Sequence, residues 1–296
     1  MDAAQWDCAC ISRSFQVFYR HVSDTLLRLR QVFFMDRLAP VRAFLDSLPC
    51  AVYSRHESLC RLGNSQTVVV FVHGIQGSPS QFGWLMDVLP PETDFVNLLL
   101  PGHGRSVRAF RKAGKADWEN TVSELVRLLS RTYRRIIWVG HSMGCLLGLH
   151  AARLMPDAFS ALLLLNCPFA LRPTWRYLRN NLLATLLFIP SSDPYVLAAR
   201  EANSVPLRFS LSNLFILRPY WGLLRMIRNG RRDLRPLPMP VYACWAERDE
   251  IVSPASMDFA AANGFEGKCY DRCGHNYLTD EARHDIQQTF VRILSQ

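Results

Sequence analysis

Hydrophobic and polar residues follow two different patterns along most of the chain. Short runs of consecutive apolar residues, such as TVVVFVH, are typical of strands that are buried on both faces of a sheet. Longer segments with apolar residues three and four positions apart are typical of amphipathic helices. We predict strands at Thr67–His73, Phe95–Leu100, Arg135–Gly140, Ala161–Asn166, Val241–Ala246 and Lys268–Asp271. We predict helices at Pro79–Leu89, Asp117–Thr132, Met143–Met155, Pro254–Ala262 and Thr279–Leu294.

The alternation of strands with helices predicts an α/β fold, with a mostly parallel central sheet flanked by helices. We expect Asp117 to cap the N-terminus of its helix. Residues 168–238 interrupt the alternation with helical patterns only, which predicts an inserted helical cap, or lid. The predicted division is therefore an N-terminal helical extension at 1–60, a core at 61–167 and 239–296, and the lid at 168–238.

The N-terminal extension contains apolar residues at helical spacing, together with several arginines. A basic amphipathic helix can lie on a membrane surface. It can also pack against the main domain, which is the interpretation that we favour. The apolar residues are Phe15, Phe18, Val22, Leu26, Leu29 and Phe33.

The composition is that of a globular protein. The chain has 296 residues, of which 49% are hydrophobic, and this is too apolar for a disordered chain. Residues 1–10 carry two aspartates and no basic residue, so we do not expect a secretory signal. No charge-free apolar run reaches the length of about 18 residues that a membrane span needs. We therefore expect a cytoplasmic protein.

The nine cysteines of this chain are interpreted as reduced thiols in a reducing compartment. The pairs Cys8 and Cys10, and Cys269 and Cys273, lack the two-residue spacing of a zinc knuckle. No metal site is therefore predicted.

Positive charge is concentrated in the predicted lid. The formal net charge is +9, and residues 168–238 contain eleven arginines against three acidic residues. Such a segment is either a solvated helical face or a surface for peripheral contact with anionic lipid or small anions. The N-terminal helix is a second candidate for contact with a membrane. We do not expect nucleic acid as a partner, and the sequence carries no prediction of the oligomeric state.

The segment GHSMG, at Gly140–Gly144, fits the pattern G-x-S-x-G between a predicted strand and a predicted helix. In this context the serine occupies a strained turn, and the flanking glycines permit close backbone packing. The N-terminus of the following helix directs free N–H groups at negative charge that develops beside the serine. Ser142 is therefore the candidate nucleophile.

A serine hydroxyl needs a base and a carboxylate that orients the base. His275 and Asp249 each follow a predicted strand, in the chain order serine, acid, histidine that sheets of this type deliver. Glu247 and Glu250 are alternative acids in the same loop, and we favour Asp249.

The loop His73–Gly77 follows the first buried strand. The backbone N–H groups of Ile75 and Met143 are the candidate oxyanion hole, which would hold the oxygen of a reacting carbonyl group. A plain glycine turn is the alternative for this loop. Candidate pocket-lining residues are His73, Gly74, His103 and His141, and a structural role in a loop is the alternative for His103.

From Thr67 to the C-terminus the chain resembles the α/β-hydrolase superfamily. The branch that it resembles most contains carboxylesterases, monoacylglycerol lipases and lysophospholipase-like proteins of the serine aminopeptidase type. The resemblance implies catalytic roles for Ser142, Asp249 and His275, and oxyanion roles for Ile75 and Met143. It rests on FVHGIQGSP (Phe71–Pro79), LPGHGRS (Leu100–Ser106), GHSMG (Gly140–Gly144), AERDEIV (Ala246–Val252) and GH (Gly274–His275).

These features predict hydrolysis of a small-molecule ester or lipid through an acyl-enzyme, without a metal or organic cofactor. The apolar and aromatic lid favours a short to medium acyl chain, for example on a monoacylglycerol. A lysophospholipase, a thioesterase and an acyltransferase would use the same three residues and are alternatives. A binding protein that has kept the fold without catalysis is the alternative from another class.

Overall fold

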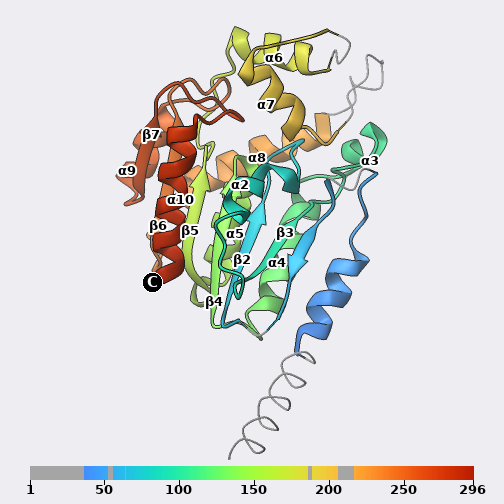
Figure 1. Ribbon diagram of the computed structural model, residues 1–296, viewed down its shortest axis with the longest axis vertical. Coiled ribbons are helices and arrows are strands. Elements are labelled where there is room, and N and C mark those ends of the chain that lie inside the picture. Colours follow the sequence, from blue (N-terminus) through green and yellow to red (C-terminus); the bar gives the residue numbers. More distant parts are fainter. Residues whose placement is uncertain (1–36, 53–55, 64, 186–188, 206–216) are drawn as a thin grey trace, which may run out of the picture.

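The computed structural model describes residues 37–52, 56–63, 65–185, 189–205 and 217–296 (Figure 1). The predicted helix from Phe15 to Phe33 lies outside these residues. Within them, seven strands form one sheet in the order β1-β3-β2-β4-β5-β6-β7. The strands are β1 (Leu59–Arg61), β2 (Thr67–Val72), β3 (Asp94–Leu98), β4 (Arg135–His141), β5 (Phe159–Leu165), β6 (Val241–Ala246) and β7 (Glu266–Tyr270).

The predicted mostly parallel sheet is confirmed. β1 pairs with β3 in antiparallel orientation, and every other neighbouring pair of strands in this sheet is parallel. Each of the six predicted strands is present with ends shifted by at most two residues. β1 was not predicted, because its three residues are mostly exposed and lie at the edge of the sheet, where no apolar run is needed.

Helices cover both faces of the sheet and divide the core into two clusters. One cluster contains residues of α4 (Lys115–Leu129), α5 (Met143–Leu154), α8 (Leu217–Asp233) and α9 (Ala255–Ala262). The other contains residues of α2 (Gly83–Met86) and α10 (Asp280–Ser295).

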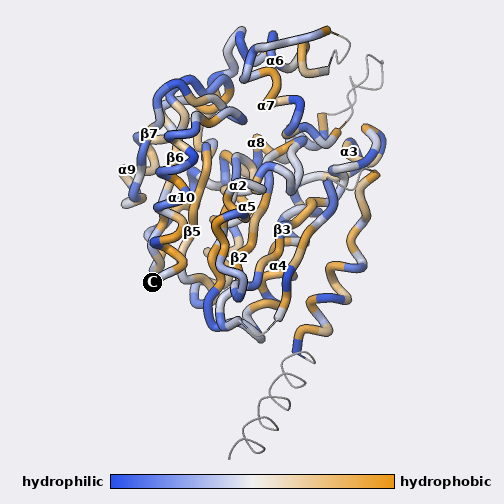
Figure 2. The backbone as a smooth tube through the Cα atoms, viewed as in Figure 1, coloured by the Kyte–Doolittle hydropathy of each residue, from blue (hydrophilic) through white to orange (hydrophobic). Residues whose placement is uncertain are grey.

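Strand β2 shows how the two clusters produce a continuous apolar run. Val68, Val70 and Val72 point into one cluster, while Val69 and Phe71 point into the other. Successive side chains of a strand alternate between the faces of the sheet, so a strand covered on both faces is apolar at every position. Hydrophobic residues accordingly follow the central strands in Figure 2.

Two helix predictions need correction. Asp117 is not the N-cap of α4, because the helix begins at Lys115 after the extended residue Gly114. Asp117 is instead the third helical residue, and its carboxylate accepts the N–H of Gly114 at 2.9 Å from inside the helix. The predicted helix at 79–89 is a 3₁₀ turn, η2 (Pro79–Phe82), followed by the single turn of α2, and α3 (Val107–Lys112) was not predicted.

Between β5 and β6 the described chain forms α6 (Trp175–Thr185), α7 (Pro194–Ala202) and α8. α6 packs against α7 above the carboxyl ends of the central strands (Figure 1), whereas α8 packs against α3, α4 and α5. The helical character of residues 168–238 is thus observed in their described part. The assignment of this segment as a lid stays a prediction.

The described end of the N-terminal extension packs against the core. Residues 37–47 are helical, and both Leu38 and Val41 are fully buried in the cluster that contains α4 and α5. Arg42 donates a hydrogen bond to the carbonyl of Leu62 at 2.7 Å. In the described part of the chain no helix is both long and apolar enough to cross a membrane, and the cysteines there carry free thiols.

The contact of α5 with the end of β2 depends on Gly144, where a Cβ would lie 1.9 Å from the Val72 carbonyl oxygen. We expect Gly144→Ala to lower the free energy of unfolding by about 3 kcal/mol or more, because a backbone carbonyl cannot yield to the methyl group. Urea unfolding followed by circular dichroism measures the change. Gly83→Ala is the control, since its methyl group meets no atom within 4 Å. Equal stability of the two variants would contradict this account of the packing.

Candidate active site

The structure brings together the three residues expected to act in catalysis. Ser142 follows β4, Asp249 follows β6 and His275 follows β7, so all three lie at the carboxyl edge of the sheet. The Ser142 Oγ is 3.1 Å from His275 Nε2, and His275 Nδ1 is 2.8 Å from Asp249 Oδ2. All three side chains are buried. This is the geometry in which a histidine can remove the proton of a serine hydroxyl while a carboxylate orients the ring.

Ser142 occupies the strained turn that its motif predicts. Its backbone has φ 51° and ψ −113°, a conformation that residues with a side chain rarely adopt. A Cβ at Gly140 would lie 2.6 Å from the backbone of Gly144, so both glycines are required by the close packing of the turn. The turn places Ser142 directly before the first residue of α5.

Asp249 is distinguished from the neighbouring glutamates by its contacts. Its Oδ1 accepts the backbone N–H groups of Ile251 at 2.8 Å and Val252 at 2.7 Å, which leaves Oδ2 for His275. Glu247 is exposed and points to the backbone N–H of Arg272. Glu250 is buried but binds the backbone of His275 rather than its ring.

Burial lowers the pKa of His275, but the charge and hydrogen bond of Asp249 and the charge of Glu250 outweigh this effect. The resulting pKa lies above the ordinary value of 6.5. The imidazolium that forms when Ser142 loses its proton is therefore favoured at this position. The candidate base is thus held by a buried carboxylate, as nucleophilic catalysis by a serine would require.

The backbone carbonyl of His275 is held by two side chains. His141 Nε2 donates to it at 2.8 Å, and Asn166 Nδ2 donates at 3.0 Å. Because its Nε2 carries the proton, the Nδ1 of neutral His141 is an acceptor. Burial, and then the neighbouring His275, lower the pKa of His141 to about 3, so His141 stays neutral.

The loop at 74–77 lies against Ser142, the candidate nucleophile, since a Cβ at Gly74 would be 3.0 Å from Ser142 Cβ. Within the described residues, the backbone N–H groups of Ile75 and Met143 make no hydrogen bond. The N–H of Met143 belongs to the first turn of α5, whose N–H groups have no partner inside the helix. Both groups thus stay candidates for the oxyanion hole.

His73 and His103 bind the backbone of this loop through their rings. Neither of them lines the two cavities described next. His73 Nδ1 donates to the Gly74 carbonyl at 2.8 Å, and its Nε2 accepts the N–H of Leu100 at 3.1 Å. The Nε2 of His103 accepts the N–H of Gln76 at 3.1 Å. Burial keeps both rings neutral, lowering the pKa of His103 to about 4 and that of His73 well below its ordinary value.

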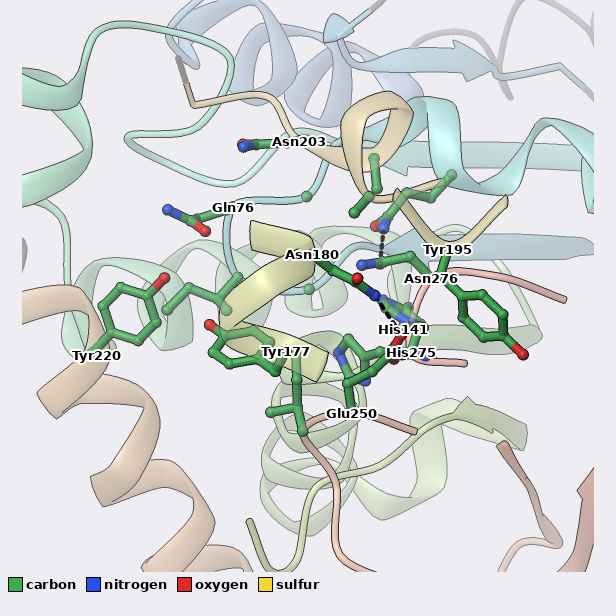
Figure 3. A pocket seen from close by; sticks show the side chains of 17 residues that line it. Gln76, His141, Tyr177, Asn180, Tyr195, Asn203, Tyr220, Glu250, His275 and Asn276 are labelled. Atoms are coloured by element: carbon green, nitrogen blue, oxygen red, sulfur yellow. Dashed lines mark hydrogen bonds between the residues drawn. The ribbon is translucent and has the colours of Figure 1, made fainter. Parts of the chain in front are cut away.

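Two cavities meet at His141 and His275. A small cavity of about 80 Å³ lies between the loop at 74–77 and the helices α6, α7 and α8. Polar and apolar groups share its wall, and Figure 3 shows carboxamide and phenol groups around His275. A larger cavity of about 400 Å³ extends toward α2 and α10 and has a mixed apolar and polar wall. Of the predicted pocket-lining residues, Gly74 lines the small cavity and His141 lines both.

Several residues of the site have no signal in the sequence. Asn166 holds the backbone of His275 from a left-handed conformation with φ 52° at the end of β5. Ser204, after α7, binds the loop at 74–77 through the carbonyl groups of Gln76 at 2.8 Å and Gly77 at 2.6 Å. Asn180 of α6 contacts Glu250 at 3.2 Å. A polar residue in a helical or turn segment is usually solvated, so the sequence does not distinguish these three residues from surface residues. Only the folded structure shows that they contact the loops of the site.

Comparison with known proteins gives a family and a set of similar structures. A family model described as the alpha/beta hydrolase family matches residues 69–286. The uncharacterized hydrolase YugF of Bacillus subtilis is 28% identical over 241 residues, which cover 74% of this chain and 84% of that protein. Two further curated relatives are matched only in part. The matching segment covers 30% of the length of one of them and 27% of the length of the other.

The similar structures have low sequence identity and therefore support the fold alone. A structure of the metagenome-derived lipolytic enzymes LipS and LipT has a TM-score of 0.63 at 16% identity, covering 83% of this chain and 100% of that one. The monoacylglycerol lipase of Paleococcus ferrophilus has a TM-score of 0.57 at 17% identity, covering 77% and 94%.

The buried neutral histidines predict loss of stability in acid. Unfolded His103 binds a proton near pH 6.5 but folded His103 only near pH 4, so the unfolded state binds more protons between these values. This single group should remove about 3 kcal/mol of stability as the pH falls through that range. The variant His103→Gln does not titrate and should lose less stability between the same pH values. Urea unfolding at several pH values measures how the free energy of unfolding of each protein depends on pH. The same pH dependence in both proteins would contradict the lowered pKa of His103.

Proposed function

The chain belongs to the alpha/beta hydrolase family, and from this premise we propose that it is a serine hydrolase that cleaves carboxylic esters through an acyl-enzyme. The observation that carries the proposal is the continuous hydrogen-bonded arrangement of Ser142, His275 and Asp249, with Ser142 on a strained turn before α5. The free N–H groups of Ile75 and Met143 beside Ser142 support it.

In the proposed reaction, Ser142 Oγ attacks the carbonyl carbon of the ester as His275 Nε2 takes its proton. The N–H groups of Ile75 and Met143 stabilise the negative oxygen of the tetrahedral intermediate. The alcohol leaves with the proton from His275. Water then attacks the acyl-enzyme with His275 again as base, and the carboxylic acid leaves as Ser142 recovers its proton. Asp249 stabilises the imidazolium in both halves of the reaction.

For the substrate we propose an ester with a short to medium acyl chain, for example a monoacylglycerol. The larger cavity supports this choice, because Trp84, Leu165 and Leu278 line it together with His275. The small cavity is suited to the hydroxyl groups of a leaving alcohol, because its wall includes the polar groups of Tyr177, Asn180 and Asn276. Relatives of the same fold include proteins named as lipolytic enzymes and as a monoacylglycerol lipase.

We expect Ser142→Ala to abolish ester hydrolysis. Loss of a serine nucleophile lowers kcat by about a millionfold in a comparable hydrolase, so the variant should fall to the background rate. The measurement is hydrolysis of p-nitrophenyl esters of increasing chain length by both proteins. The control is Ser130→Ala, whose exposed hydroxyl only bonds the Arg127 carbonyl of its own helix. A wild-type protein inactive on every oxoester, or an active Ser142→Ala, would refute the proposal and direct attention to thioesters and acyl transfer.

The pH profile provides a second test. His275 must be neutral to act as base, and its pKa lies above 6.5, so kcat/KM should rise with pH through an apparent pKa above that value.

We expect Asp249→Asn to lower kcat by about 10,000-fold, because the ring of His275 loses its orienting acceptor. Stopped assays from pH 5 to pH 9 measure both effects. A flat profile would show that His275 is not the base, and full activity in Asp249→Asn would show that Asp249 does not orient it.

A further inference from the structure

Glu250 is a second buried carboxylate beside His275, and the proposed reaction does not use it. Only 6% of its surface is exposed. One oxygen, Oε2, accepts the backbone N–H of His275 at 2.8 Å. The other, Oε1, accepts Nδ2 of Asn180 at 3.2 Å (Figure 3). Each oxygen therefore has a specific donor, and the two donors belong to different parts of the fold.

Asn180 connects this carboxylate to the helices above the site. It lies on α6, is 5% exposed, and its Oδ1 accepts two hydrogen bonds from Arg179, at 3.1 and 2.9 Å. Arg179 also forms an ion pair with Asp193, the N-cap residue of α7. A polar chain thus leads from the start of α7 through α6 and Glu250 to the backbone of His275.

The loop of His275 is held from two sides. His141 and Asn166 bind its carbonyl group from the sheet, whereas Glu250 binds its N–H group. A hydrogen bond to a charged acceptor is roughly twice as strong as one to a neutral acceptor. Because the backbone of His275 carries the ring, a displacement of this loop changes the distance from Nε2 to the nucleophile.

We propose that Glu250 is a positioning residue that fixes the backbone of His275 and makes its placement depend on α6 through Asn180. The inference rests on the proposed function, since it takes His275 as the base. α6 in its observed position supplies the donor that occupies Oε1 of Glu250. The base is thereby held by a helix that also forms a wall of the small cavity.

The charge of Glu250 gives this role an observable signature. The titratable groups that face His275 are Asp249 and Glu250 from the loop after β6 and His141 from the end of β4, and Tyr195 of α7 lies near Glu250. Burial lowers the pKa of His275, and the two carboxylates raise it. Removal of the Glu250 charge should therefore move the pKa of His275 downward, whereas loss of the Asn180 contact, which leaves that charge in place, should not.

The test is the rate of phosphonylation of Ser142 by a fluorophosphonate probe as a function of pH, which needs no natural substrate. Glu250→Gln keeps the size and one acceptor, and we expect a maximal rate reduced by about tenfold to a hundredfold and a midpoint at lower pH. Asn180→Ala keeps the charge, and we expect a reduced rate without a shift of the midpoint to lower pH. Glu247→Gln is the matched control from the same loop and should behave like the wild type.

Wild-type rates and midpoints in both Glu250→Gln and Asn180→Ala would overturn the inference, while labelling of the wild type at Ser142 would leave the proposed function intact. If the wild type is not labelled at all, the proposed function fails and the inference fails with it. Circular dichroism establishes that each variant is folded. If Glu250→Gln is unfolded, the rate of Asn180→Ala decides, because that change leaves the carboxylate in place.

Discussion

The backbone of Ser142 is the constraint on which the rest of the site depends. A residue held at φ 51° and ψ −113° costs about 1–3 kcal/mol, and it persists only where the surroundings determine it. Here β4 fixes the chain before the turn, and α5, packed against the end of β2 at Gly144, fixes the chain after it. The position of Ser142, the candidate nucleophile, and the packing of α5 on the sheet are therefore consequences of the same contact.

The histidines around this turn illustrate how partners determine charge. All of them are buried, yet the pKa of His275 is raised whereas those of His73, His103 and His141 are lowered. His275 alone among these four has a carboxylate on its ring, while the others bond backbone groups. A neutral ring that donates at one nitrogen and accepts at the other is suited to holding a loop. The candidate site thus combines one histidine whose ring is paired with a carboxylate and three neutral histidines that bond the backbone.

The sequence predicts the parts of this protein that depend on local patterns. Strands buried on both faces appear as apolar runs, and the turn at Ser142 appears as two glycines around a serine between a strand and a helix. The choice among Glu247, Asp249 and Glu250 is different, because three acids within four residues have the same local signal. The shape of the turn after β6 decides it, by directing Asp249 to the imidazole ring and Glu250 to the backbone. Contacts such as that of Glu250 with Asn180, 70 positions apart, have no local signal at all.

The helices between β5 and β6 contact the loops that carry the candidate site residues. α8 belongs to the layer that packs on the sheet, whereas the region of α6 and α7 makes polar contacts with three separate loops. Asn180 binds the loop after β6, Tyr195 donates to a carbonyl after β7, and Ser204 binds the loop after β2. These three loops carry, in the same order, the candidate acid, the candidate base and a candidate oxyanion donor. A movement of α6 and α7 would therefore change the relative positions of the candidate acid, the candidate base and the candidate oxyanion donor, so their alignment depends on this pair of helices.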